Sequence, residues 1–164
     1  MVSFTEEIDE TLEDTQKGKF LTFAVGKEDY GIEIKNVTEI IGIQEITGVP
    51  ELPPYVKGII NLRGKIIPVI DVRLKFKKDA MEYNDRTCII VIQILELSIG
   101  LIVDNVAEVL SIDDQNIVQP PDVKTGFNNR YVRGIGKVDQ TVKLILDCDK
   151  LLSEEEVEAI AGNI

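Results

Sequence analysis

The chain has 164 residues and a formal charge of −11, and 44% of its residues are hydrophobic, which is enough to support a folded core. Histidine is absent, and Cys88 and Cys148 lie in apolar runs without CxxC spacing, which excludes His-based metal sites, Ser-His-Asp triads and Cys-His dyads. No apolar run approaches the roughly 20 residues of a membrane span, and no basic signal peptide opens the chain, so we expect a cytoplasmic protein without membrane insertion.

The acidic residues gather at the two ends of the chain. Residues 1–18 form an acidic leader that we predict to be disordered, and residues 153–164 form a second acidic segment. Residues 1–14 and 153–164 hold ten acids and no base, which accounts for most of the net charge and leaves 19 acids against 18 bases in residues 15–152. Without a basic stripe, nucleic-acid binding is disfavoured.

The first half of the chain is typical of β structure. Residues 20–25 and 30–34 are apolar runs joined by the turn-like Gly26-Lys27-Glu28-Asp29, which predicts a hairpin. Further strands are expected at 37–43 and 65–71. The link Ile46-Thr47-Gly48-Val49-Pro50-Glu51-Leu52-Pro53-Pro54 either docks a partner or packs over the end of a barrel, and we favour packing.

The second half repeats the first. Residues 31–41 recur 69 positions later at 100–110, and residues 55–71 recur 76 positions later at 131–147. A hairpin of 88–95 with 97–103 and strands at 106–112 and 141–147 follow by analogy. We therefore predict a mainly β fold with two homologous five-stranded, SH3- or OB-like β-barrel subdomains, encoded by repeat blocks 20–76 and 88–152.

The C-terminal segment has a sequence pattern typical of an α-helix instead. Ser153 and Glu156 form a Ser-x-x-Glu capping box, and apolar residues follow at helical spacing. We predict a short C-terminal α-helix docked by Leu152, Val157 and Ile160.

Few residues are candidates for chemistry. No phosphate-binding loop is present, and Glu39 and Glu108 recur at equivalent repeat positions, where a structural role is favoured over a catalytic dyad. Asp71 and Asp147 each end a strand, where we expect them to accept hydrogen bonds from turn amides. These features predict no enzyme, no cofactor and no metal.

One turn differs sharply between the copies. The first copy reads Asn61-Leu62-Arg63-Gly64 where the second reads Lys137-Val138-Asp139-Gln140, so a permanent cation stands opposite an acid. Features that both copies share are explained by the fold, whereas a feature that only one copy has needs another explanation. Arg63 is either part of a site or an ordinary solvated turn arginine.

Four segments carry a resemblance to a known family: 20–23, 30–34, 37–40 and above all 58–71, which includes Asn-Leu-Arg-Gly. With them, residues 19–152 resemble the chemotaxis coupling proteins of the CheW family. The resemblance implies two intertwined barrels, no catalysis, and an adaptor that couples the cytoplasmic tip of methyl-accepting chemotaxis receptors to the regulatory domain of the histidine kinase CheA. Recruitment to membrane receptor arrays would then occur through these partners. The absence of a receiver domain argues against the related adaptor CheV, and the initial methionine argues against a fragment of CheA.

The resemblance also implies site residues. The receptor-binding set is Leu21, Ile34, Val37, Glu39, Ile40 and Arg63. The set that binds the kinase or shapes the surface around Arg63 is Ile46, Val49, Leu52, Gly58, Asn61 and Leu62.

Two other functions are compatible with the residues themselves. One is a ligand-binding β-barrel for oligosaccharide or single-stranded nucleic acid, which is weakened by an aromatic content of 5% and the absence of tryptophan. The other is an enzyme that uses Glu39 or Glu108.

Overall fold

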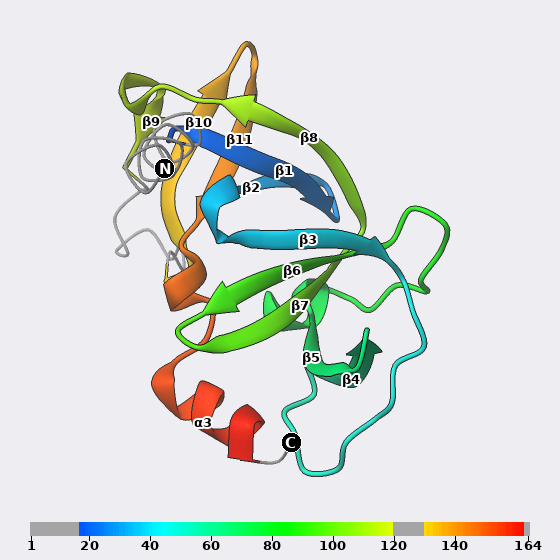
Figure 1. Ribbon diagram of the computed structural model, residues 1–164. Helices are drawn as coiled ribbons and strands as arrows, with labels where there is room; N and C mark the ends of the chain where they lie inside the picture. The colour runs from blue at the N-terminus through cyan, green and yellow to red at the C-terminus, as the bar shows by residue number, and fades with distance from the viewer. Residues whose placement is uncertain (1–16, 120–129, 163–164) are drawn as a thin grey trace, which may run out of the picture.

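The β-branched, apolar runs of the sequence form strands in the computed structural model, which describes residues 17–119 and 130–162 (Figure 1). The first repeat forms β1 (Lys19–Val25), β2 (Glu28–Glu33), β3 (Val37–Gly42), β4 (Val56–Leu62) and β5 (Lys65–Asp71). The second repeat forms β6 (Cys88–Ile94), β7 (Leu97–Val103), β8 (Asn105–Ser111), β9 (Ile117–Val118), β10 (Val132–Val138) and β11 (Thr141–Leu146). The predicted mainly β fold is confirmed, whereas the predicted leader lies, except for its last two residues, outside the described residues.

Short helical segments join or follow the strands. They are η1 (Ile34–Asn36), α2 (Val72–Lys75), η2 (Asp114–Asn116), η4 (Cys148–Lys150) and α3 (Glu154–Gly162). Asp71 Oδ1 accepts a hydrogen bond from the Arg73 amide at 2.9 Å, and Asp147 Oδ1 accepts one from the Asp149 amide at 3.0 Å. The predicted role of these two aspartates at strand ends is confirmed.

Each sheet contains strands of both repeats. Among the described residues, the strand order is β8-β1-β2-β11-β10-β9 in a six-stranded sheet, called sheet A here, and β3-β6-β7-β5-β4 in a five-stranded sheet, called sheet B. The contacts between repeats include the parallel pairs β2–β11 and β5–β7. Sheet boundaries therefore cross the boundaries of the repeat blocks, and the division into two barrel subdomains stays a prediction.

The recurring glycine marks the point where the repeats interlock. Gly100 of β7 lies opposite Val69 of β5, and Gly31 of β2 lies opposite Ile145 of β11, both in parallel pairs. A Cβ atom on Gly100 would lie 2.8 Å from Val69 Cγ1, which is closer than carbon atoms pack. The repeated glycine therefore serves the close approach of strands from different copies.

Three apolar clusters fill the interior of the described part of the chain. The largest lies between the sheets, where Ile90 and Ile92 of β6 point, and a second contains Ile89 and Val91 from the other face of the same strand. A third, around Phe20 and Ile145, lies within sheet A. Because both faces of β6 are buried, its sequence is apolar at successive positions instead of alternating.

The C-terminal helix is capped and docked as predicted. The Glu156 amide donates to Ser153 Oγ at 3.1 Å, and the Ser153 amide donates to Glu156 Oε1 at 3.0 Å. Leu152 and Ile160 are buried and Val157 packs against the cluster between the sheets. Glu156 also accepts hydrogen bonds from Lys75 Nζ at 2.5 Å and from the hydroxyl of Tyr55, which ties α3 to α2 and to the residue just before β4.

This carboxylate makes the docking of α3 dependent on pH. Burial alone would raise the pKa of Glu156, but the Lys75 ammonium, the Tyr55 hydroxyl and the Ser153 amide hold that pKa at about 2, below its ordinary 4.5. A lowered pKa stabilises the folded state above pH 4.5, and the contribution is lost as pH falls from 4.5 to about 2.

Glu156→Gln is therefore expected to lower the free energy of unfolding at pH 7 by about 1.5 kcal/mol and to flatten its pH dependence in that window. Urea denaturation across pH measures both effects. Glu155→Gln, at an exposed neighbouring position, is the control. If the free energy of unfolding of the two variants fell identically with decreasing pH, the Glu156 contacts would not stabilise the fold.

Candidate partner-binding surface

Strand β3 is an edge strand of sheet B, and its faces differ because its pairing is irregular. Val37 lies opposite Ile92 of β6, but Glu39 lies opposite the adjacent Val91, so β3 has an extra residue at this point. Directly opposed side chains share a face of the sheet. The shift therefore places Val37 and Ile40 on the face toward the cluster between the sheets, and Glu39 on the other face.

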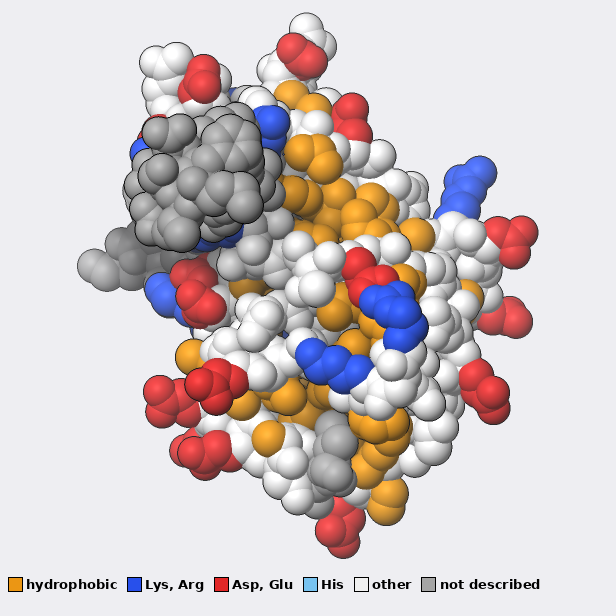
Figure 2. All heavy atoms as spheres, in the orientation of Figure 1, with side chains coloured by type: hydrophobic (Ala, Val, Ile, Leu, Met, Phe, Trp, Pro, Cys, Tyr) orange, Lys and Arg blue, Asp and Glu red, His pale blue; other side chains and the backbone are white. Residues whose placement is uncertain are grey.

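The first of these faces, together with the preceding η1, carries an apolar surface, which we call the β3 patch and define as Ile34 of η1 with Val37 and Ile40 of β3. Ile34 and Val37 are half-buried and pack against the cluster between the sheets, and Ile40 is 43% exposed. Figure 2 shows hydrophobic side chains gathered on the molecular surface between β3 and the strands β1 and β8. An apolar surface of this kind suits the apolar face of a partner helix.

Leu21 does not belong to this surface. Its side chain is 1% exposed and lies in the cluster between the sheets. The reason is topological, since β1 runs between β8 and β2 in the interior of sheet A. The prediction that Leu21 contacts a partner is therefore wrong for this conformation, and Leu21 supports the patch from below.

The second face of β3 carries an ion pair with the β4–β5 turn. The Arg63 guanidinium donates to both carboxylate oxygens of Glu39, from Nη1 to Oε1 at 3.2 Å and from Nη2 to Oε2. The hydrogen bonds from Arg63 hold the pKa of Glu39 below its ordinary value. The Arg63 side chain is 70% exposed. An exposed pair contributes little to folding, so the pair is available to a partner.

The ion pair joins strands that are far apart in the strand order of sheet B. β3 and β4 form its two opposite edges. The link between them also pairs, since the Thr47 amide donates to the Ile59 carbonyl at 2.9 Å and the Ile59 amide donates to the Thr47 carbonyl at 2.9 Å. Sheet B is therefore curled until its first edge approaches the turn beside its last.

The turn that presents Arg63 is a tight two-residue turn with a side-chain hydrogen bond. Arg63 and Gly64 have φ angles of 52° and 87°, as in the two-residue turns that join tightly paired strands. The Gly64 amide donates to Asn61 Oδ1 at 2.8 Å, which fixes the turn from the side. Asn61 thus shapes the surface around Arg63.

The second copy has a turn at the equivalent position, and within the described residues this turn lacks the ion pair. Asp139 occupies the position equivalent to Arg63 with a φ of 55°. In the second copy, the residue equivalent to Glu39 is Glu108. Its carboxylate forms no ion pair within residues 17–119 and 130–162. The sequence difference between the two turns thus corresponds to a structural difference, because Arg63 of the first copy pairs with Glu39.

Most of the remaining predicted residues are only partly accessible. Ile46 and Leu62 pack against the cluster inside sheet B, and Leu52 packs against the cluster between the sheets. Val49 is half-buried, Gly58 is buried and Asn61 is exposed. The packing role favoured for the link is confirmed for Ile46 and Leu52.

The carboxylates offer no catalytic arrangement. Glu39 lies in sheet B and Glu108 in sheet A, and Glu39 is occupied by Arg63. In the part of the chain that the structure describes, no group of three acidic or cysteine side chains could hold a metal ion, and no helix is long and apolar enough to cross a membrane.

Comparisons with known proteins agree on one family. The family model of the CheW-like domain matches residues 19–156. "Chemotaxis protein CheW" of Klebsiella aerogenes is 36% identical over 151 residues, which cover 92% of this chain and 90% of that protein. "Chemotaxis protein CheW" of Treponema pallidum is 32% identical and covers 88% and 87%, respectively. The crystal structure of "scaffolding protein TtCheW" from Thermoanaerobacter tengcongensis superposes with a TM-score of 0.78 at 39% identity, over 85% of this chain and 94% of that one. The chain described here belongs to the CheW-like domain family.

Proposed function

We propose that this chain is a non-enzymatic scaffold of bacterial chemotaxis that couples methyl-accepting receptors to the histidine kinase CheA in the cytoplasm. Family membership and the scaffolding neighbour support the general role. The observation that carries the proposal is an edge strand with an apolar patch on one face and, on the other, an exposed ion pair that only the first repeat forms among the described residues.

In the proposed mechanism the receptor's helical tip lies along β3. The β3 patch buries one apolar face of that tip, and the Glu39–Arg63 pair fixes its register through charge. Because the two features lie on opposite faces of an edge strand, the receptor straddles β3. CheA would contact the surface around the link and the Arg63 turn. Asn61 and the half-buried Val49 are its accessible residues, and the packed residues of the set, Ile46, Leu52, Gly58 and Leu62, shape it.

Co-sedimentation tests the coupling itself. Receptor-containing membranes, CheA and this chain are mixed, and each component is omitted in turn. We expect the chain to pellet with the membranes, and CheA to pellet in larger amounts when the chain is present. Equal pelleting of CheA with and without the chain would contradict the coupling role.

The β3 patch is tested by Ile40→Asp. A charge on this exposed side chain should weaken binding of a receptor-tip fragment about fivefold, because the carboxylate must be desolvated against an apolar helix face. Isothermal titration calorimetry gives the affinity. Val142→Asp, at a position of sheet A that is 55% exposed, is the matched control and should bind normally. An equal loss in both variants would remove the patch from the receptor interface.

A further inference from the structure

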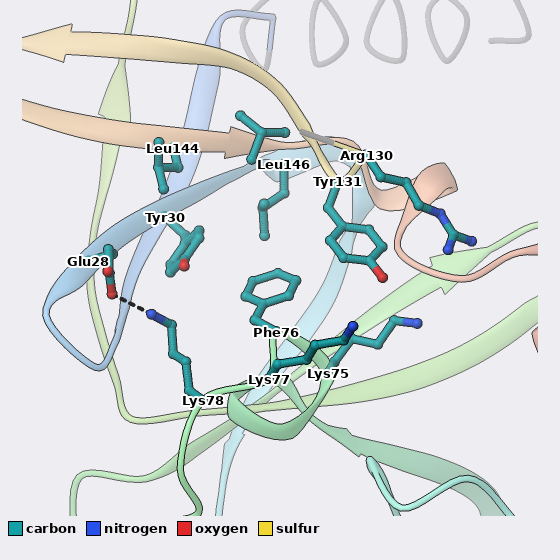
Figure 3. A pocket seen from close by; sticks show the side chains of 11 residues that line it. Glu28, Tyr30, Lys75, Phe76, Lys77, Lys78, Arg130, Tyr131, Leu144 and Leu146 are labelled. Carbon is teal, nitrogen blue, oxygen red and sulfur yellow. Dashed lines mark hydrogen bonds and ion pairs between the residues drawn. The ribbon is translucent and has the colours of Figure 1, made fainter. Parts of the chain in front are cut away.

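A cavity of about 480 Å³ opens where α2 and the segment after it meet sheet A. Figure 3 shows its lining, which comes from β2, from residues 75–78 and from β10 and β11 with the residues just before β10. It shares no residue with the β3 patch or with the Glu39–Arg63 pair. Its volume is within the range of pockets that bind specific ligands.

Aromatic rings line this cavity in a row. The Phe76 ring centroid lies 5.3 Å from that of Tyr30 and 5.4 Å from that of Tyr131. The whole chain has only nine phenylalanines and tyrosines and no tryptophan, so three rings in one cavity are a concentration. Leu144 and Leu146 complete an apolar wall. Such a wall suits a large apolar or aromatic side chain.

The rim of the cavity is cationic in a protein that is acidic overall. Lys75, Lys77, Lys78 and Arg130 line it, against the single acid Glu28. Glu28 accepts a hydrogen bond from Lys78 at 2.6 Å, and the nearby Glu156 pairs with Lys75 at 2.5 Å and Arg130 at 3.3 Å. Counting both acids still leaves an excess of two positive charges.

The cations stand at two separate ends of the apolar wall. In Figure 3, Lys78 lies at one side of Phe76, and Arg130 lies at the opposite side beside Tyr131. Lys77 is exposed and forms no ion pair within the described residues. A complementary ligand would therefore carry an apolar body between acidic groups, so that both ends meet positive charge.

We propose that this cavity binds an acidic peptide segment of a partner protein, with one large apolar side chain seated against Phe76 and with flanking carboxylates paired to the rim. Lys77 supplies a charge-assisted hydrogen bond. A nucleic acid is the less suitable occupant, because its continuous phosphate backbone would extend beyond the small cationic rim onto a chain with a net charge of −11.

The absence of tryptophan makes the test direct, because a probe peptide with one tryptophan can be excited alone in the presence of the full chain. The probe is the capped peptide Glu-Glu-Trp-Glu-Glu, and its fluorescence anisotropy is titrated with the protein. We expect saturable binding that weakens with salt, whereas Lys-Lys-Trp-Lys-Lys should not bind.

Lys77→Glu should weaken the acidic peptide about fivefold. The matched control Lys57→Glu makes the same change of charge at an exposed position of β4 and should bind within twofold of wild type.

Phe76→Leu tests the apolar wall and should weaken binding of the acidic peptide without changing the charge of the protein. Equal losses in the two lysine variants, binding of the basic peptide, or tighter binding of a five-nucleotide single strand would each overturn the proposal. Receptor co-sedimentation should be unchanged in Lys77→Glu, which separates this site from the proposed coupling function.

Discussion

Arg63→Asp is expected to weaken binding of a receptor-tip fragment about 30-fold while the protein remains folded. The guanidinium is 70% exposed and bidentate to Glu39, so its reversal leaves two carboxylates side by side where a partner meets a cation. The fold should tolerate the change, because an aspartate, Asp139, already has a positive φ of 55° at the equivalent position of the second repeat. Affinity is measured by isothermal titration calorimetry, and folding by circular dichroism.

Two further variants show why the affinity falls. Lys137→Asp reverses an exposed charge near the equivalent turn of the second copy and should bind normally. In the double variant Glu39→Arg with Arg63→Glu, the ion pair is rebuilt with its charges exchanged. If Arg63 contacts the receptor, this variant binds as weakly as Arg63→Asp. Recovery of wild-type affinity would show that the pair matters only for the local structure.

Gly58→Ala is expected to lower the free energy of unfolding by about 3 kcal/mol. Gly58 has a φ of 147°, and a Cβ atom there would overlap the Thr47 carbonyl and lie 3.0 Å from Ile46 Cγ2. The alanine would therefore separate the link from β4 and break the two Thr47–Ile59 hydrogen bonds. Urea denaturation measures the loss.

Gly48→Ala is the matched control for this variant. Gly48 lies in the same link, has no positive φ, and a Cβ atom there would meet nothing within 4 Å. Its free energy of unfolding should differ from that of wild type by less than about 0.5 kcal/mol. Equal denaturation midpoints for the two variants would show that the link can separate from β4 without cost.

Sequence patterns predicted local structure well. The two hairpins, the Arg63 turn, the capping box and the duplicated aspartates all depend on residues close together in the chain, where propensity and hydrogen bonding decide the outcome. The ion pair of Glu39 with Arg63 was not predictable as a contact. It depends on the extra residue in β3 and on the curl of sheet B, and neither leaves a signature in the apolar pattern.

The burial of individual apolar side chains could not be predicted from the sequence either. Leu21 and Ile40 both belong to apolar strands, yet one is 1% and the other 43% exposed, because β1 is an interior strand and β3 an edge strand. The aromatic cavity brings Tyr30, Phe76 and Tyr131 together from segments about 50 residues apart.

The interleaving of strands determines when the molecule can fold. In sheet B, β3 is separated from β5 and β4 by the hairpin β6–β7 of the second repeat, and in sheet A, β1 and β2 lie between β8 and β11. During synthesis, β3 and one edge each of β1, β2 and β5 have no neighbour until the second repeat emerges, so sheet B cannot be completed before β7 has left the ribosome, and sheet A cannot be completed before β11 has. A protease cut between the repeats would leave two fragments held together by shared sheets. The duplicated halves thus form one cooperative unit, and neither can be lost without the other.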